Sequence, residues 1–341
     1  MSQPGDESQY PQEDRPPDPS PAAPDDLDYR HRTGRRHYAA HQRGLDATAF
    51  GQLVLRLPGT LMSLLVLALL SSVLAAWFGI PFWVLPLIWL ASGVLVFHRP
   101  SEDFFARHLL RLQRPMPAEY SRLAPIWHEV TARAGVDSRK YELWIEDSED
   151  LNAYAAAGHI VGVTRFALDH LPSSQLAAVL AHELGHHTGG HVWSSLLGEW
   201  YALPGRLAWR LIRYLVTVAV ARARDYSWLA LSVLIFVIGL VTITTLEKLY
   251  GLPLLLLATP YLIAAVGRRA ELRADQHAAA LGFARELALV LEAMYQADRS
   301  AGQTAKAAAG RGPEDGPGLL DRLLSTHPDY PTRLHRLRSH L

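Results

Sequence analysis

The chain has 341 residues, no net formal charge and no cysteine. Its length permits two domains, and the lack of cysteine excludes disulfides and thiolate metal sites. Any bound metal must therefore be held by His, Asp or Glu.

The N-terminal segment is acidic and rich in proline up to residue 28, where the one basic side chain is Arg15. So few large apolar residues cannot bury enough surface to offset the entropy of ordering, and we predict a disordered tail over 1–44. The end of this tail is basic. A basic patch is compatible with nucleic-acid binding, but its position before an apolar run favours a membrane flank, so we predict no nucleic-acid partner.

The first apolar region predicts a pair of membrane spans. From Leu57 to Phe97 the chain has no Asp, Glu, Lys, Arg or His, and glycine and proline near residue 80 predict a turn. One crossing takes about 20 helical residues. We predict a transmembrane hairpin over 45–98, with spans at about 60–78 and 81–97; the alternative is a buried hairpin of a soluble core.

The second apolar region, 226–267, contains two uncharged runs and predicts another hairpin. Arg206, Arg210 and Arg213 recur at helical spacing before it, so 201–225 is either a helix on the membrane surface or an ordinary solvated helix. Arginines flank the spans but not the hairpin tips. The positive-inside rule therefore places both termini and the segment between the hairpins in the cytoplasm of a multi-pass membrane protein.

Between the hairpins the pattern predicts a helix over 117–135 and strands over 141–146 and 159–164, with 152–158 as a further candidate strand. A second helix contains HELGHH, residues 182–187. Together, the predicted helices and the few short strands indicate a fold that is mainly α with a small β-sheet.

The HELGHH helix has the spacing of a zinc hydrolase. His182 and His186 are four apart, so their imidazoles lie on one helix face and can reach one metal ion. Glu183 is rotated away from this pair but stays close enough to contact the water that a metal activates. The alternative is a helix with surface histidines, and we assign His187 to that class.

A catalytic zinc takes three protein ligands and keeps one position open. After the second hairpin, Glu271 and Asp275 are four apart on one predicted helix face, with the small Ala274 and Ala278 beside them. Glu271 is a candidate third ligand, and Asp275 a candidate to orient a ligand histidine. Ion pairs with neighbouring arginines are the alternative.

HELGHH followed by ELRAD across an apolar hairpin resembles the integral-membrane zinc metallopeptidases of the HtpX and CAAX prenyl protease family. The resemblance implies that His182, His186 and Glu271 bind Zn²⁺, that Glu183 is the general base, and that Asp275 supports a ligand.

Two further stretches resemble this family. LNAYAAAG (151–158) is similar to an edge strand beside the cleft, which implies substrate binding by Asn152, Ala153, Tyr154 and Ala155. STHPDYPTRLHRL is similar to a C-terminal element that faces the active site, and implies catalytic roles for His327 and Arg333.

The resemblance implies an α+β fold in which four transmembrane helices carry a cytoplasmic gluzincin-type zinc metallopeptidase domain. That domain is built from 99–200 and 268–341, the second part with a flexible insert at 300–318. Two spans before the motif favour the HtpX-like branch.

The implied function is zinc-dependent endopeptidase activity on membrane or misfolded proteins at the cytoplasmic face, as in protein quality control. The implied cofactor is one Zn²⁺ per chain, and the implied partners are polypeptide substrates and the lipid bilayer. The alternatives are a non-catalytic zinc-binding scaffold or receptor and a protease that processes prenylated peptides. An intramembrane site-2 protease is disfavoured by the polar residues around HELGHH, and a transporter by the lack of polar residues inside the spans.

Overall fold

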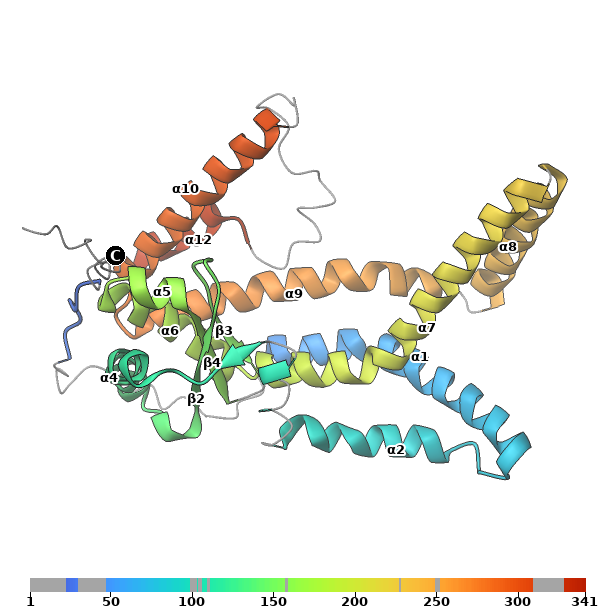
Figure 1. The fold of residues 1–341 in the computed structure, drawn as a ribbon, viewed down its shortest axis with the longest axis horizontal. Coiled ribbons are helices and arrows are strands. Elements are labelled where there is room, and N and C mark those ends of the chain that lie inside the picture. Colours follow the sequence, from blue (N-terminus) through green and yellow to red (C-terminus); the bar gives the residue numbers. More distant parts are fainter. Residues whose placement is uncertain are drawn as a thin grey trace, which may run out of the picture.

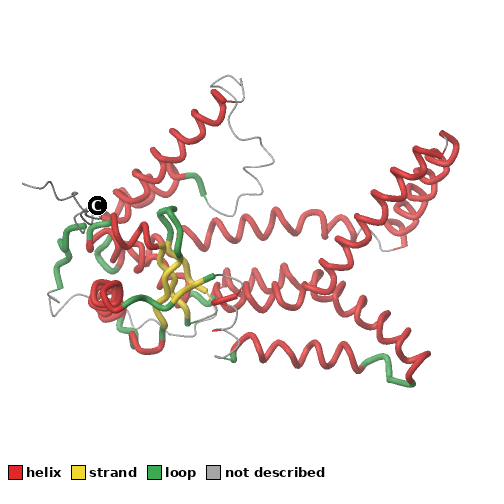
Figure 2. The backbone as a smooth tube through the Cα atoms, in the orientation of Figure 1, coloured by secondary structure: helices red, strands yellow, loops and turns green. Residues whose placement is uncertain are grey.

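The structure is a computed structural model. It describes residues 23–29, 47–98, 103, 106–108, 111–156, 159–226, 228–248, 252–308 and 328–341. The fold is mainly helical with one small mixed sheet, as the sequence predicts, and long helices extend from the region that contains the sheet (Figures 1 and 2).

The sheet has four strands in the order β1-β2-β4-β3. They are β1 (Leu112–Gln113), β2 (Glu142–Glu146), β3 (Ala153–Ala156) and β4 (Ile160–Thr164). β2 and β4 pair in parallel, whereas β1 and β3 are antiparallel strands at the two edges. The three predicted strands are confirmed; β1 was not predicted because two residues carry no alternating pattern.

Helices pack on the sheet to form the main apolar core. They are α4 (Pro117–Ala134), α5 (Arg165–His170), α6 (Ser173–Thr188), α10 (Ala284–Ala308) and α12 (Tyr330–Leu337), with the short turns η2 (Ser138–Lys140) and η3 (Arg338–His340). Leu123 and Ile126 of α4 and Leu176 and Leu180 of α6 are fully buried in this core. Gly135 ends α4 with a φ of 69°, a left-handed conformation that favours glycine.

The remaining helices are long and apolar over part of their length. They are α1 (Ala47–Phe78), α2 (Val84–Ser92) with η1 (Gly93–Phe97), α7 (His191–Tyr226), α8 (Trp228–Lys248) and α9 (Leu252–Ala280). α7 is continuous, so the helix predicted over 201–225 is the larger, C-terminal part of it. α9 continues without interruption from the second apolar region into the domain that holds the sheet (Figure 1).

Within the described part of the chain, one helical segment is long and apolar enough to cross a membrane, Ala49–Phe78 in α1. Large apolar side chains on it, such as Leu65 and Leu69, are exposed, which fits a lipid-facing helix better than a core helix. The apolar stretches Val84–Val96 and Trp228–Val237 are shorter. Thirteen helical residues span only about 20 Å of a roughly 30 Å hydrocarbon core, so the prediction of four transmembrane helices is not confirmed.

α1 and α7 lie side by side next to the domain that holds the sheet and diverge farther out (Figure 1). Where they meet, the Gly205 N–H donates to the Ser63 Oγ at 2.9 Å, and Arg56 of α1 forms an ion pair with Glu199 of α7. Since α7 follows α6 after a two-residue turn, these contacts connect the membrane-type helix α1 to the HELGHH helix.

Two segments predicted to be flexible are partly ordered. Residues 23–29 of the tail pack on the domain, and the Leu27 side chain is only 9% exposed. α10 runs through the first half of the predicted insert to Ala308. The rest of the tail before α1, and of the insert, lies outside the described residues.

Candidate metal centre

The metal centre forms where α6 and α9 pack against each other, although a helical hairpin separates them in the sequence. The contact is close because Gly185 of α6 faces Ala274 of α9. A Cβ atom on Gly185 would lie 3.0 Å from the Ala274 Cα, a closer contact than nearly all Cβ atoms make, so a side chain here would push the two helices apart. Small residues at this crossing, as the sequence predicts, let residues of the two helices share one site.

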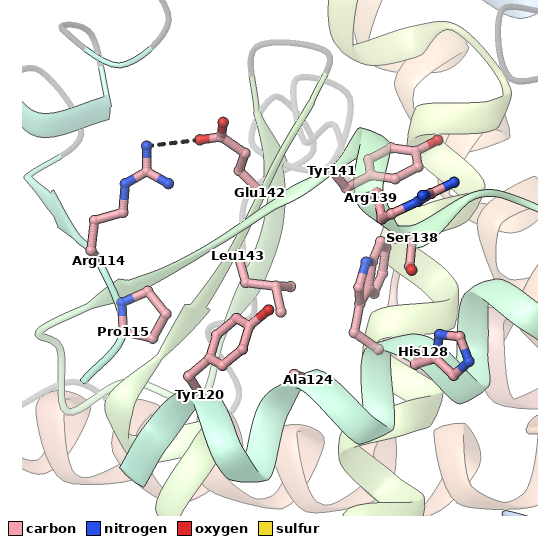
Figure 3. Close-up of a pocket in the computed structure, with 11 residues that line it drawn as sticks. Arg114, Pro115, Tyr120, Ala124, His128, Ser138, Arg139, Tyr141, Glu142 and Leu143 are labelled. Carbon is pink, nitrogen blue, oxygen red and sulfur yellow. Dashed lines mark ion pairs between the residues drawn. The ribbon is translucent and has the colours of Figure 1, made fainter. Parts of the chain in front are cut away.

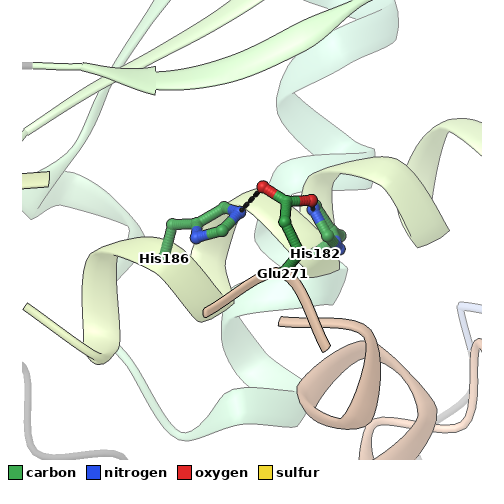
Figure 4. Close-up of side chains that lie close together, drawn as sticks. All are labelled: His182, His186 and Glu271. Carbon is green, nitrogen blue, oxygen red and sulfur yellow. Dashed lines mark ion pairs between the residues drawn. The ribbon is translucent and has the colours of Figure 1, made fainter. Parts of the chain in front are cut away.

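His182, His186 and Glu271 each offer one ligand atom, and these atoms lie within 4.8 Å of one another (Figure 4). The Glu271 carboxylate lies between the two rings, with Oε2 3.5 Å from the His182 Nε2 and Oε1 3.4 Å from the His186 Nε2. Ligand atoms bound at about 2.0–2.1 Å to a tetrahedral zinc are about 3.4 Å apart. The donor set therefore fits zinc, and the 4.8 Å maximum separation means that the side chains must draw closer together to bind one ion.

Asp275 holds the other side of the His182 ring. Its Oδ1 lies 2.9 Å from the His182 Nδ1, which leaves Nε2 directed at Glu271. Arg333 of α12 in turn donates to both carboxylate oxygens of Asp275, at 2.8 Å and 2.6 Å. This is the arrangement by which a carboxylate fixes the orientation of a ligand histidine.

The charges in the centre favour a cation. Burial opposes a charge on His182, but hydrogen bonds to Asp275 and Glu271 raise its pKa to about 10. Burial likewise opposes the charge of Asp275, yet hydrogen bonds from His182 and Arg333 hold the pKa of this carboxyl below its ordinary value. Carboxylates outnumber the guanidinium here, so the centre favours a positive charge, which a proton on His182 or a metal ion can supply.

Glu183 lies between the histidine pair and strand β3. Its side chain is buried, with 7% of the residue exposed, and it accepts a hydrogen bond from the Ala155 backbone. Burial raises the pKa of Glu183, while positive charge on His182 or His186 lowers it. A carboxyl group with a raised pKa is a more effective proton acceptor near neutral pH.

β3 is an edge strand, and its predicted substrate-binding residues have different surroundings. The Asn152 carbonyl accepts from the Thr164 N–H at 3.0 Å, which ties the start of β3 to the end of β4. Ala153 is buried, and the Tyr154 ring covers Gly162 of β4. Among the four predicted residues, Ala155 is the one with a hydrogen bond to the centre.

The two C-terminal residues predicted to be catalytic differ in outcome. His327 lies outside the described residues. Arg333 is brought to the centre, but its guanidinium is bound to Asp275 and lies 3.5 Å from Glu271 Oε2. The sequence did not predict the Arg333–Asp275 pair, because 58 positions separate the two residues.

His187 is not a surface residue, contrary to the prediction. It is 5% exposed, its Nε2 lies 3.0 Å from the Ile160 carbonyl oxygen, and its ring packs edge-on against Tyr141. Leu180 and Leu184, seven and three residues earlier on the same helix face, are fully buried. That apolar face was the sequence signal for a buried His187, which fastens α6 to the sheet.

A separate cavity of about 570 Å³ lies along α4 and β2 (Figure 3). Its lining includes Tyr120, His128 and Arg139, together with Arg114 and Glu142, whose side chains form an ion pair at 3.0 Å. The three metal-ligand candidates do not line this cavity, so it is distinct from the metal centre.

The comparisons with known proteins agree with this geometry. The sequence model of peptidase family M48, the family that contains HtpX, matches residues 117–341, a region that includes all residues of the centre described above. No curated protein matches the chain. Because the family match covers well over half of the sequence, the chain belongs to peptidase family M48.

Proposed function

We propose that this protein is a membrane-anchored, zinc-dependent endopeptidase that hydrolyses peptide bonds of membrane or misfolded proteins. The observation that carries the proposal is the grouping of His182, His186 and Glu271 within 4.8 Å, with Glu183 next to them. The zinc dependence of M48 peptidases supports the choice of metal.

The residues of the centre divide the chemistry among them. Zinc, when bound, lowers the pKa of water and polarises a carbonyl group. Glu183 accepts the proton of the attacking water and then delivers it to the leaving nitrogen. Asp275 and Arg333 keep the His182 ring in its ligand orientation. His327, assigned by resemblance, is our candidate donor to the oxyanion.

The substrate is held in an extended conformation along β3. An edge strand has backbone groups available for pairing, and pairing through the backbone binds peptides with little selectivity for side chains. Support comes from the position of Ala155, which joins this edge to Glu183. Low selectivity suits an enzyme that degrades unfolded proteins of many sequences.

The site operates at the cytoplasmic face, close to the lipid. Glu271 lies four residues beyond Gly267, where the uncharged run ends, and α9 is continuous between them. At about 1.5 Å per helical residue, the metal lies within about 10 Å of the membrane boundary. The arginines beside the apolar segments support the cytoplasmic orientation.

The first test is Glu183→Gln, made in the full chain and purified in detergent with zinc. Glutamine has the same shape but cannot accept the proton, so cleavage of an unstructured protein should fall by a factor of about 10² or more. Zinc content should stay at the wild-type value. The matched control is Glu292→Gln, because Glu292 is an exposed glutamate on α10.

Unaltered turnover in Glu183→Gln would exclude this base. A zinc-loaded wild-type chain without proteolysis, or with proteolysis insensitive to a chelator, would contradict the peptidase proposal. Zinc binding without any proteolysis would favour a zinc-binding scaffold.

A further inference from the structure

The short tail segment Pro24–Tyr29 binds at the N-terminal end of α6. The Asp26 carboxylate accepts two hydrogen bonds from Ser174, one from the backbone N–H and one from the Oγ, both at 2.8 Å. The Pro24 carbonyl accepts from the Ser173 N–H at 3.0 Å. Both N–H groups belong to the first turn of α6, where a helix leaves its donors without internal partners.

Asp26 thereby takes the place of a local helix cap. Pro172, the residue at the N-cap position of α6, provides no side-chain hydrogen bond. A carboxylate satisfies the first-turn donors and is stabilised by the helix dipole. Burial works against the charge of Asp26, but the hydrogen bonds from Ser174 keep the pKa of its carboxyl below the ordinary value. Asp26 therefore caps the metal-binding helix from 148 positions away in the sequence.

Two further contacts, independent of the helix terminus, hold the same segment. The Leu27 side chain joins the main apolar core, and it is the one leucine of the first 44 residues. Arg133 of α4 donates from Nη2 to the Asp28 carbonyl oxygen at 2.8 Å. Arg133 is itself fixed by a 2.7 Å ion pair with Glu129 and by stacking over Phe283. Because polar contacts flank the buried Leu27 on both sides, the segment can bind in only one alignment of its residues with the surface.

We propose that Ser173, Ser174 and Arg133 form a docking surface for an acidic peptide with a central leucine, and that Pro24–Tyr29 occupies it in cis. The surface is nine residues from His182, or about 14 Å along the helix, so the segment does not cover the metal centre. It instead stabilises the start of the helix that carries His182 and His186. The inference does not depend on the chain being a peptidase.

The test is hydrogen exchange on the full chain in detergent, compared between wild type, Asp26→Ala and Leu27→Asp. Loss of the cap should speed exchange of the first-turn amides of α6 by about fivefold, and loss of the buried leucine should have at least this effect. Asp150→Ala is the charge-matched control, because Asp150 is an exposed aspartate outside the docked segment. It should leave α6 unchanged.

Rescue in trans separates docking from general destabilisation. A synthetic peptide of residues 23–29 should restore slow exchange in Asp26→Ala and in Leu27→Asp, whereas the same peptide with aspartate in place of the leucine should not. Unchanged exchange in both variants would overturn the proposal, as would equal rescue by the two peptides or rescue by neither. Protection that rises with protein concentration would assign the surface to the tail of a second copy and overturn docking in cis.

Discussion

At the scale of single residues, the metal centre depends on a row of charged side chains behind the ligands. Arg333 binds Asp275, and Asp275 contacts the nitrogen of His182 that points away from Glu271. Each member is buried, so none can be removed without leaving a charge unpaired. Arg333 is therefore a positioning residue, and its effect on the reaction passes through His182.

Replacing Arg333 by methionine should weaken zinc binding by about 10- to 100-fold and lower turnover, because Asp275 then no longer holds His182 firmly. Arg333→Lys should recover part of the affinity, since lysine keeps the charge but not the two parallel hydrogen bonds. Arg336→Met, an exposed position of the same helix, is the control. Zinc competition with a chromophoric chelator measures the effect, and wild-type affinity in Arg333→Met would refute this role.

His277 makes the stability of the domain depend on pH. Burial, and then the charge of His182, lower its pKa to about 4. The unfolded chain protonates this histidine at its ordinary pKa, so His277 destabilises the folded state as pH falls from about 6.5 towards 4. His277→Leu should therefore stabilise the protein more at low pH. We expect it to raise the free energy of unfolding by about 2 kcal/mol more at pH 5 than at pH 7.5. Thermal unfolding at the two pH values measures this, and an equal effect at both would contradict it.

At the scale of elements, the crossing of α6 and α9 decides whether the ligands meet. Gly185→Ala places a methyl group against the Ala274 backbone, 3.0 Å from its Cα, and the helices must separate to accept it. We expect a loss of about 1–3 kcal/mol in stability and weaker zinc binding. Gly51→Ala, where a Cβ meets nothing within 4 Å, is the matched control. If Gly185→Ala has the same zinc affinity and the same free energy of unfolding as Gly51→Ala, the close approach of α6 and α9 is not needed for the site.

The elements that the sequence predicted are those with a local pattern. Alternating residues predict β2 and β4, and the HELGHH and ELRAD spacings predict both ligand helices, so the grouping of His182, His186 and Glu271 was foreseeable. Contacts between distant segments carry no such pattern. The bond from Arg333 to Asp275 and the docking of Leu27 depend on tertiary packing, which one sequence does not show.

At the scale of the whole molecule, the fold connects a membrane-type helix to the site of chemistry. α1 contacts α7 at Ser63 and Gly205, α7 follows the HELGHH helix, and α9 joins the second apolar region to Glu271. The docked tail fastens the other end of α6. The HELGHH helix is thus held at its start by the N-terminal tail and at its end by helices that leave the domain.

The claim on which the account depends is that two segments, separated in sequence by a helical hairpin, bind one metal ion together. Zinc content and affinity of the purified full chain, compared with Glu271→Ala and Glu183→Gln, test it most directly. The account predicts one zinc per wild-type chain, the same in Glu183→Gln, and an affinity more than about 100-fold weaker in Glu271→Ala. Wild-type zinc affinity in Glu271→Ala would contradict it.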